Sequence, residues 1–368
     1  MDLDRTTPSP RPARHTLARD ACRQPAIVAS SLLGLLLIAF TITGSPALSA
    51  GPQPAVRIAG VIYLGDLPTV IADHENLFRR HGLDASVHFN HSGRDNLHQL
   101  RAGETDFALM ALTPIVLDRL ADETPGGPDD PVILASLVHA TSLNAVVARP
   151  SAGIDTPADL TGRRVALRKG TNAEFVWWLF AHFHGLDPDA VRLVDQSVPA
   201  VQAALRNGEV DAAVLWEPWL SRLLASSDEE LRVFGGSNIY TAKWVLVTTR
   251  RSVDEHPDRA RAMLAAYRDA IDRIERDPDT AISTYARRAD VDKSILRRNW
   301  QALDYELNLQ WSVIATLQQQ IDWAERSGRQ PLVAPIRVLE LIESAPLRAV
   351  DPARVGVPAA EGPREPQP

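Results

Sequence analysis

The feature that most constrains the fold is an alternation of apolar and amphipathic runs between residues 56 and 249. Residues 56–62 and 107–112 are short, mostly apolar runs, typical of buried strands. Residues 67–80 have helical periodicity, and Gly82, a common helix-ending residue, follows them. Such alternation predicts an α/β fold in which helices cover mainly parallel sheets. Further strands are expected at 84–90, 132–139, 144–149, 164–168, 191–194, 211–216, 231–235 and 244–249, and further helices at 94–101, 114–121, 172–184, 198–207 and 218–226.

The order of these runs favours two lobes over one large sheet. A chain that leaves a first lobe near Val147, builds a second lobe and returns near Thr248 crosses between them twice, and two crossings form a hinge. A ligand is then expected in the cleft between the lobes, at the carboxyl ends of the strands. The predicted divisions are an N-terminal segment (1–50), the first part of lobe one (51–148), lobe two (149–246), a return to lobe one with C-terminal helices (247–345) and a disordered tail (346–368).

Beyond residue 250 the pattern predicts helices and no further strand. Helical periodicity is found at 258–276, 278–288, 293–304, 312–326 and 337–344. We expect these helices to pack on lobe one. After Pro346 the chain is rich in Pro, Ala and Glu and has no apolar period, which predicts disorder.

The first fifty residues are predicted to direct export. Five arginines precede an uncharged, mostly apolar run at 26–43, and small residues follow it as far as Ala50. This order is typical of a secretory signal peptide cut after Ser49 or Ala50. The run is also just long enough to span a bilayer, so an uncleaved N-terminal membrane anchor is the alternative. In either case the body of the chain is expected to be periplasmic or otherwise extracytoplasmic.

Composition argues against several classes of function. The net charge of −7 and the lack of a basic stripe argue against nucleic-acid binding. The single cysteine, Cys22, precedes the apolar run, so the exported body has no disulfide, cysteine zinc site or cysteine nucleophile. We expect no cofactor and no metal. The histidines at 74, 81, 88, 91 and 98 are interpreted as a solvated surface, with a metal site as the less favoured reading.

Five stretches carry a resemblance to a known family. They are LPTVIADHENLFRRHGLDASV (67–87), LRAGETDFALMALTP (100–114), DLTGRRVALRKGTNAEFVWWLF (159–180), AALRNGEVDAAVLWEPWLSRL (203–223) and HPDRARAMLAAYRDAIDRIERDP (256–278). In this order they resemble the periplasmic solute-binding proteins of ABC importers, in the branch that includes nitrate, aliphatic-sulfonate, taurine and thiamine-precursor binders. The resemblance extends over residues 56–328.

The resemblance implies a two-lobed periplasmic-binding-protein fold of the type II kind, with two parallel-rich sheets, a hinge and a C-terminal helical extension on lobe one. It implies that the chain is not an enzyme. As a monomer, it would capture a small organic solute, either a sulfonate-like anion or a heteroaromatic thiamine-precursor-like compound. It would deliver that solute to an ABC permease in the inner membrane. A ligand sensor for a signalling partner and, less favoured, an enzyme of thiamine-pyrimidine synthesis are the alternatives.

Candidate solute-binding residues lie where strands give way to helices. Thr171 and Asn172 open a helix after Lys169 and Gly170, and a helix N-terminus offers free N–H groups and a positive dipole end to an anion. Simple capping of the helix is the competing interpretation. The same reasoning gives Ser92, Gly93 and Thr113 on lobe one. Tyr63 and Asp66 follow the first strand, where a cleft wall is expected, with a simple turn as the alternative. Thr141 is a further candidate.

Trp216 and Glu217 end a strand of lobe two. A tryptophan there can stack on a flat or apolar ligand. The carboxylate of Glu217 would repel an anion, but it could accept a hydrogen bond from an amine or a ring NH₂, or pair with an arginine outside the cleft. Both an anionic and an amine-bearing heteroaromatic solute therefore stay open.

Overall fold

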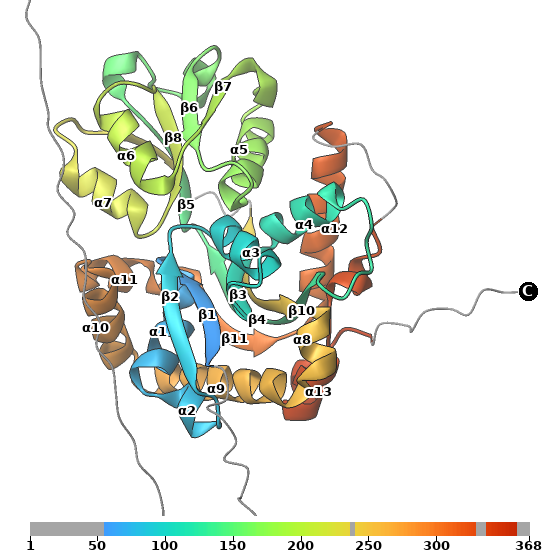
Figure 1. Cartoon of the computed structure of the whole chain (residues 1–368). Helices are drawn as coiled ribbons and strands as arrows, with labels where there is room; N and C mark the ends of the chain where they lie inside the picture. Colours follow the sequence, from blue (N-terminus) through green and yellow to red (C-terminus); the bar gives the residue numbers. More distant parts are fainter. Residues whose placement is uncertain (1–54, 236–239, 329–335, 359–368) are drawn as a thin grey trace, which may run out of the picture. The chain divides into compact units, whose positions relative to one another are not determined.

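The computed structural model describes residues 55–235, 240–328 and 336–358, which belong to one compact unit (Figure 1). The predicted export signal at 1–50 lies outside the described residues, as does the end of the predicted tail at 359–368. Within the described part of the chain, no helix is both long enough and apolar enough to cross a membrane.

The larger of two sheets has six strands in the order β11-β4-β10-β3-β1-β2. β1 pairs in parallel with β2 and β3, whereas β10 is antiparallel to both β3 and β4, and β11 is antiparallel to β4. These strands are β1 (Val56–Val61), β2 (Ala85–Asn90), β3 (Phe107–Ala111), β4 (Pro131–Thr141), β10 (Thr241–Thr249) and β11 (Leu303–Asn308). Its helices are α1 (Leu67–His74), α2 (Leu77–Arg80), α3 (Gly93–Arg101), α4 (Leu112–Ala121), α8 (Arg250–Glu255), α9 (Pro257–Arg276), α10 (Pro278–Ala289), α11 (Lys293–Asn299), α12 (Trp311–Arg326) and α13 (Ala345–Val350).

The smaller sheet has five strands in the order β7-β6-β8-β5-β9. β6 pairs in parallel with β7 and β8, and β5 is antiparallel to β8 and β9. Its elements are β5 (Asn144–Ala148), β6 (Arg164–Leu167), β7 (Arg192–Asp195), β8 (Ala212–Trp216), β9 (Arg232–Gly235), α5 (Asn172–Phe183), α6 (Val198–Arg206) and α7 (Trp219–Ser226). The predicted α/β class with two sheets is confirmed, but the expectation that the sheets would be parallel-rich is wrong, because both are mixed.

The structure moves both predicted lobe boundaries. β5 was expected to end the first part of lobe one, but it pairs with β8 in the smaller sheet, with Val146 opposite Val214. β10 was expected largely in lobe two, but it lies between β3 and β4 of the larger sheet. The chain therefore crosses at 142–143 and again between Gly235 and Thr241. An apolar run shows that a strand is buried, but its pairing partners decide which sheet it joins.

The C-terminal region differs from the prediction in two ways. β11 is a strand within a region expected to be helical, and it pairs with β4 at the edge of the larger sheet. The predicted disordered tail is ordered as far as residue 358, because Leu347 and Val357 are buried and a bridge joins Val355 to Leu309. Both segments are stabilised by contacts with distant parts of the chain, which a local pattern does not show.

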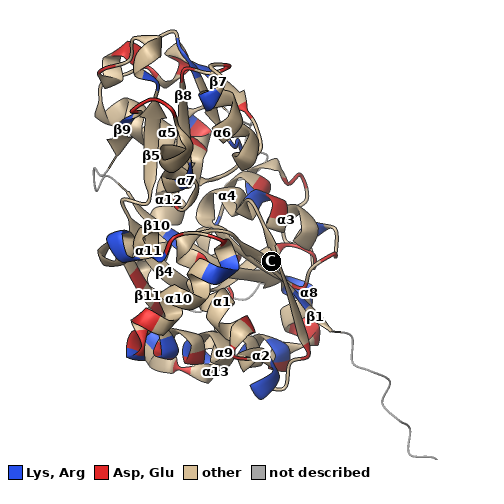
Figure 2. Cartoon of the chain, turned by 90° about the vertical axis from the view of Figure 1, so that its left-hand side faces the viewer, with Lys and Arg blue, Asp and Glu red and all other residues tan. Residues whose placement is uncertain are grey.

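Charged side chains of both signs are interspersed over the molecule, as the helices α9 and α10 in Figure 2 show. In the described part of the chain, arginines pair with nearby acids, as Arg101 does with Asp118, Asp122 and Asp130.

Candidate functional site

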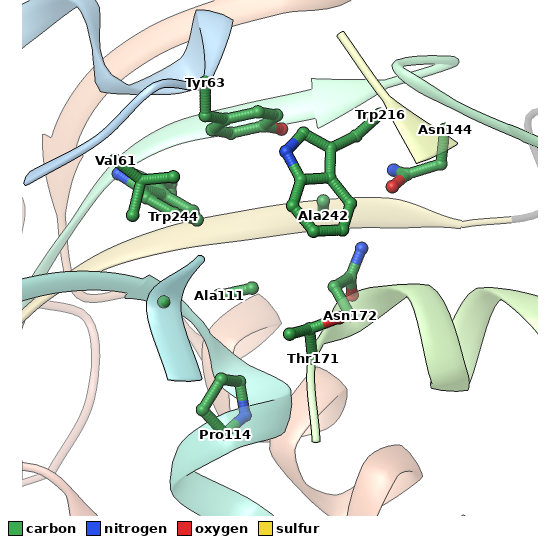
Figure 3. A pocket seen from close by; sticks show the side chains of 11 residues that line it. Val61, Tyr63, Ala111, Pro114, Asn144, Thr171, Asn172, Trp216, Ala242 and Trp244 are labelled. Carbon is green, nitrogen blue, oxygen red and sulfur yellow. The ribbon is translucent and has the colours of Figure 1, made fainter. Parts of the chain in front are cut away.

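A pocket lies between the two sheets (Figure 3). Val61 and Ala111 stand at the carboxyl ends of β1 and β3, and Trp216 at the carboxyl end of β8. Strands and helix starts from both sheets therefore form its wall. The lining residues are Val61, Tyr63, Gly93, Ala111, Pro114, Asn144, Thr171, Asn172, Trp216, Ala242 and Trp244.

Three aromatic side chains form one wall of this pocket. Tyr63 and Trp244 pack with ring centroids 4.7 Å apart and planes 46° apart. Trp216 extends toward the same space from β8 (Figure 3). All three side chains are buried. Aromatic faces arranged in this way suit a flat or apolar group of a ligand.

Three helices begin at the opposite wall. α3 starts at Gly93, α4 at Leu112 beside Ala111 and Pro114, and α5 at Asn172 after its cap, Thr171. Each helix N-terminus presents the positive end of a dipole and first-turn N–H groups that the helix itself leaves unpaired, of which caps engage those of Asp95 and Ala173. Among the described residues that line the pocket, none is charged. Positive potential is thus supplied by backbone dipoles, as at known anion sites on helix N-termini.

Close packing places these helix starts. At Gly93, a Cβ atom would come within 2.6 Å of the Met110 Cβ, so only glycine lets α3 begin against β3. The Ser92 hydroxyl accepts a hydrogen bond from the Asp95 N–H at 3.3 Å. The Thr171 hydroxyl accepts from the Ala173 N–H at 3.3 Å and donates to the Arg168 carbonyl at 2.7 Å. Ser92 and Thr171 therefore act first as helix caps.

Two lining residues carry buried polar atoms that have no hydrogen-bond partner in the described structure. They are the Asn172 Oδ1 and the Trp244 Nε1, although the Trp244 side chain also acts on the Asp66 carboxylate and stabilises its charged form. A buried polar atom of this kind costs free energy unless it is paired. A bound solute could accept a hydrogen bond from Trp244 and one from Asn172, since the side-chain amide can present either its oxygen or its NH₂.

The structure brings together five of the residues that the sequence singled out: Tyr63, Gly93, Thr171, Asn172 and Trp216. The other five, Asp66, Ser92, Thr113, Thr141 and Glu217, are not among the lining residues. Trp244 and Asn144 were missed. Trp244 lies near the start of an apolar strand, but its place in the pocket depends on β10 crossing back to β3.

Asp66 supports the pocket from behind. It is fully buried, and its carboxylate accepts from the Val61 N–H at 2.7 Å and from the Thr69 hydroxyl at 2.5 Å. Burial raises the pKa of Asp66 to about 7, against the opposing effect of these hydrogen bonds. The carboxylate thus holds the turn after β1 that carries Tyr63, rather than facing a ligand.

Glu217 is engaged by Ser221 of α7, and it also interacts with Arg298 and Asn299 of α11 on the other half of the molecule. Its carboxylate accepts from the Ser221 N–H at 3.1 Å and from the Ser221 hydroxyl at 2.9 Å. Burial raises the pKa of Glu217, and hydrogen bonds from Ser221 oppose this shift. This arrangement secures the first turn of α7, so the direct role toward an amine that we considered has no support from the placement of the side chain.

Polar contacts join the two halves beside the pocket. Arg168, after β6, donates to the Asp95 carboxylate of α3 at 2.8 Å. Arg94 donates to the Lys169 carbonyl at 2.9 Å, and the Trp219 Nε1 donates to the Ile62 carbonyl at 3.2 Å. These contacts hold the walls of the pocket together.

Comparisons with known proteins agree with this geometry. Residues 66–281 match the family described as NMT1/THI5 like. A protein of Brucella abortus that is designated a binding protein is 23% identical over 265 residues, 71% of this chain and 80% of that protein. The taurine-binding periplasmic protein of Escherichia coli is 22% identical over 246 residues, 65% of this chain and 73% of that protein.

Solved structures share the fold. The alkanesulfonate-binding protein SsuA from Xanthomonas axonopodis, bound to MOPS, superimposes with a TM-score of 0.68 at 20% identity. The superposition covers 80% of this chain and 99% of that one. The two curated relatives are named as binding proteins and not as enzymes.

Proposed function

The chain belongs to the NMT1/THI5-like family, and from this premise we propose that it is the extracytoplasmic solute-binding component of an ABC importer. It captures a small organic solute between two lobes and delivers it to a permease in the inner membrane. The periplasmic taurine binder among its relatives and the predicted export signal at 1–50 support this role. The pocket between the two sheets supports it independently, because closure around a ligand by two lobes requires a site of this kind.

The preferred solute is an organic anion that has a flat or apolar body. The observation that carries this proposal is the pairing of three helix N-termini with an aromatic wall in one pocket. The N–H groups and dipoles favour a sulfonate or a similar anion, and the faces of Trp216 and Tyr63 favour the body that carries it. A carboxylate in the pocket would oppose an anion, and Glu217 is turned to Ser221 instead.

A heteroaromatic solute of the thiamine-precursor kind is the second candidate. The observation that favours it is the presence of two side-chain amides, Asn144 and Asn172, beside the aromatic wall. An amide can bond a ring nitrogen and an exocyclic NH₂. Such a solute would use the same faces of Trp216 and Tyr63 but would leave the helix N-termini without an anion.

A matched set of ligands separates these candidates. Thermal-shift and calorimetric titrations should compare benzenesulfonate, its neutral analogue benzenesulfonamide, taurine, nitrate and a 4-aminopyrimidine. We expect benzenesulfonate to bind and to raise stability by about 2.7 kcal/mol at a hundredfold excess over its Kd. The sulfonamide should bind at least tenfold more weakly, because it lacks the charge. Tighter binding of the aminopyrimidine would favour the second candidate. Equal binding of the sulfonate and the sulfonamide would refute the proposal that the solute is an anion.

The transport role has its own test. Deletion of the gene should abolish high-affinity uptake of the solute by the host, and uptake should return with the wild-type gene. Normal uptake in the deletion strain, together with a lost signalling response to the solute, would favour a sensor instead.

A further inference from the structure

A second polar cluster lies on the face of the larger sheet opposite the pocket. Lys243 follows Ala242 and precedes Trp244, which both line the pocket, so its side chain points to the other face of β10. His139 of β4 lies opposite Lys243 on one side and opposite Asp304 of β11 on the other. Residues directly opposite one another in a sheet share a face, so the three side chains form a row across three strands.

Glu306, two residues after Asp304, joins this row. One ligand atom each from His139, Asp304 and Glu306 lies within 4.8 Å of the other two. An imidazole with two carboxylates is a donor set that suits zinc and similar divalent ions. Bonds from a zinc ion to such ligands are about 2.0–2.2 Å long, so the exposed Asp304 and the half-buried Glu306 need only small rotations to share one ion.

Unsatisfied polar atoms at the same place point to a missing partner. In the described structure the His139 Nε2 is buried and has no hydrogen-bond partner. Asn308, at the end of β11, is 1% exposed; its Oδ1 and Nδ2 make no hydrogen bond of normal geometry, and its side chain acts only as a neighbouring hydrogen-bonding group of His139. Native structures leave few such atoms unpaired, and each calls for an explanation.

The charges around the cluster are compatible with a bound cation. Lys243 contributes one positive charge, and its Nζ lies 3.2 Å from the Ser312 hydroxyl. Arg354 lies 3.3 Å from one oxygen of Glu306 and leaves its other oxygen free of that ion pair. Burial and the neighbouring Lys243 lower the pKa of His139, whereas Asp304, Glu306 and the Asn308 side chain raise it.

We propose that His139, Asp304 and Glu306 bind one divalent metal ion of the zinc type, with solvent or the Asn308 amide completing its coordination. The ion would tie β11 to the end of β4, three residues before the chain crosses at 142–143 into the smaller sheet. It would lie behind the strand that carries Ala242 and Trp244, separate from the solute pocket. The effect expected from this position is on stability and on the first crossing, not on solute chemistry.

Metal titration of the full-length protein, first freed of metal with a chelator, tests the proposal. Calorimetry with ZnCl₂ should give one site per chain, and Co²⁺ should give a visible absorption band typical of nitrogen and oxygen ligands. His139→Ala and Asp304→Asn should weaken Zn²⁺ binding at least about tenfold, since loss of even an outer partner of a metal ligand costs about this much. His74→Ala, which removes an exposed histidine on α1, is the matched control and should bind as the wild type does.

Lys243→Gln is expected to change Zn²⁺ affinity in the opposite direction from His139→Ala and Asp304→Asn. Removal of the neighbouring positive charge should tighten Zn²⁺ binding several-fold, because like charges repel. Asp304 is exposed, so Asp304→Asn decides the question even if His139→Ala does not fold. The proposal is overturned if the wild type binds no Zn²⁺, if Asp304→Asn binds it as tightly as the wild type, or if His74→Ala loses it equally.

Discussion

Arg168 and Asp95 form an ion pair beside the pocket, and it joins the two halves of the molecule. The guanidinium, which follows a strand of the smaller sheet, lies 2.8 Å from the carboxylate, which belongs to a helix of the larger sheet. Arg168 lies after β6, and Asp95 is in the first turn of α3. Both side chains are partly exposed, at 22% and 36%. Because the pair joins elements of the two sheets, both of which contribute residues to the pocket, it stabilises the arrangement in which both halves can contact one solute.

Arg168→Gln should weaken this arrangement. We expect solute to dissociate about two- to fivefold faster, which corresponds to at most about 1 kcal/mol for a partly exposed ion pair. Stopped-flow dissociation measurements at low and high salt check this. Asp95→Asn should give the same effect, and the double variant should add nothing to it. If the effects of the two single variants add up in the double variant, the two residues do not act as a pair. Arg232→Gln, which breaks an exposed pair with Asp155 within the smaller sheet's half, is the control.

Trp244→Phe tests what the indole N–H contributes, apart from the contribution of the aromatic ring. The substitution keeps a ring against Tyr63 and removes the Nε1, which makes no hydrogen bond of normal geometry but acts on the Asp66 carboxylate. We expect the free energy of unfolding to change little, and affinity for a sulfonate to fall about tenfold, the value of one hydrogen bond to a charged group. Calorimetry and a denaturation curve measure the two quantities. An unchanged affinity would show that the indole does not bond the solute.

Thr171→Ala tests whether a helix cap also serves the pocket. Loss of the hydroxyl removes a cap from α5 and should lower the free energy of unfolding by about 1 kcal/mol. Affinity should fall as well, because α5 begins at the pocket wall. Thr249→Ala removes the cap of α8, which is not among the pocket-lining elements, and should cost similar stability without loss of affinity. If Thr171→Ala binds solute as well as Thr249→Ala does, Thr171 only caps α5 and does not contribute to solute binding.

Glu217→Ala should cost stability and spare affinity. The carboxylate accepts two hydrogen bonds from Ser221, so its loss should lower the free energy of unfolding by about 1–2 kcal/mol. Glu217→Gln keeps one acceptor oxygen and should lose less. Melting curves and titrations with benzenesulfonate give both quantities. A large loss of affinity in Glu217→Gln, with stability kept, would place this side chain at the solute after all.

The pH dependence of stability should carry a contribution from Asp66. Its pKa is about 7 in the folded protein, above its ordinary value of 3.8, because burial disfavours the carboxylate. The folded state therefore holds the proton more tightly than the unfolded state, and stability falls as pH rises between these two values. In Asp66→Asn this slope should be absent, so denaturation curves of the two proteins between about pH 4 and pH 8 should diverge. Parallel curves would mean that the carboxylate titrates alike in both states.

Part of this molecule is determined by short stretches of its sequence. The apolar runs of β1 and β3 predict buried strands, because burial on both faces requires apolar side chains throughout. Thr171 and Ser92 predict helix starts, because a hydroxyl at that position bonds the N–H groups that the helix itself leaves unpaired. Helix starts after strands also point to the pocket, and this led to Gly93, Asn172 and Trp216.

Other features were decided only by the tertiary structure. Trp244 reaches the pocket because β10 crosses back and pairs with β3, and Asp304 reaches His139 because β11 pairs with β4. Glu217 looked like a pocket residue from its position after β8, but Ser221 draws it into α7. Strand pairing and competition among hydrogen-bond partners depend on residues far apart in the chain, whereas a local pattern reports only burial, periodicity and caps.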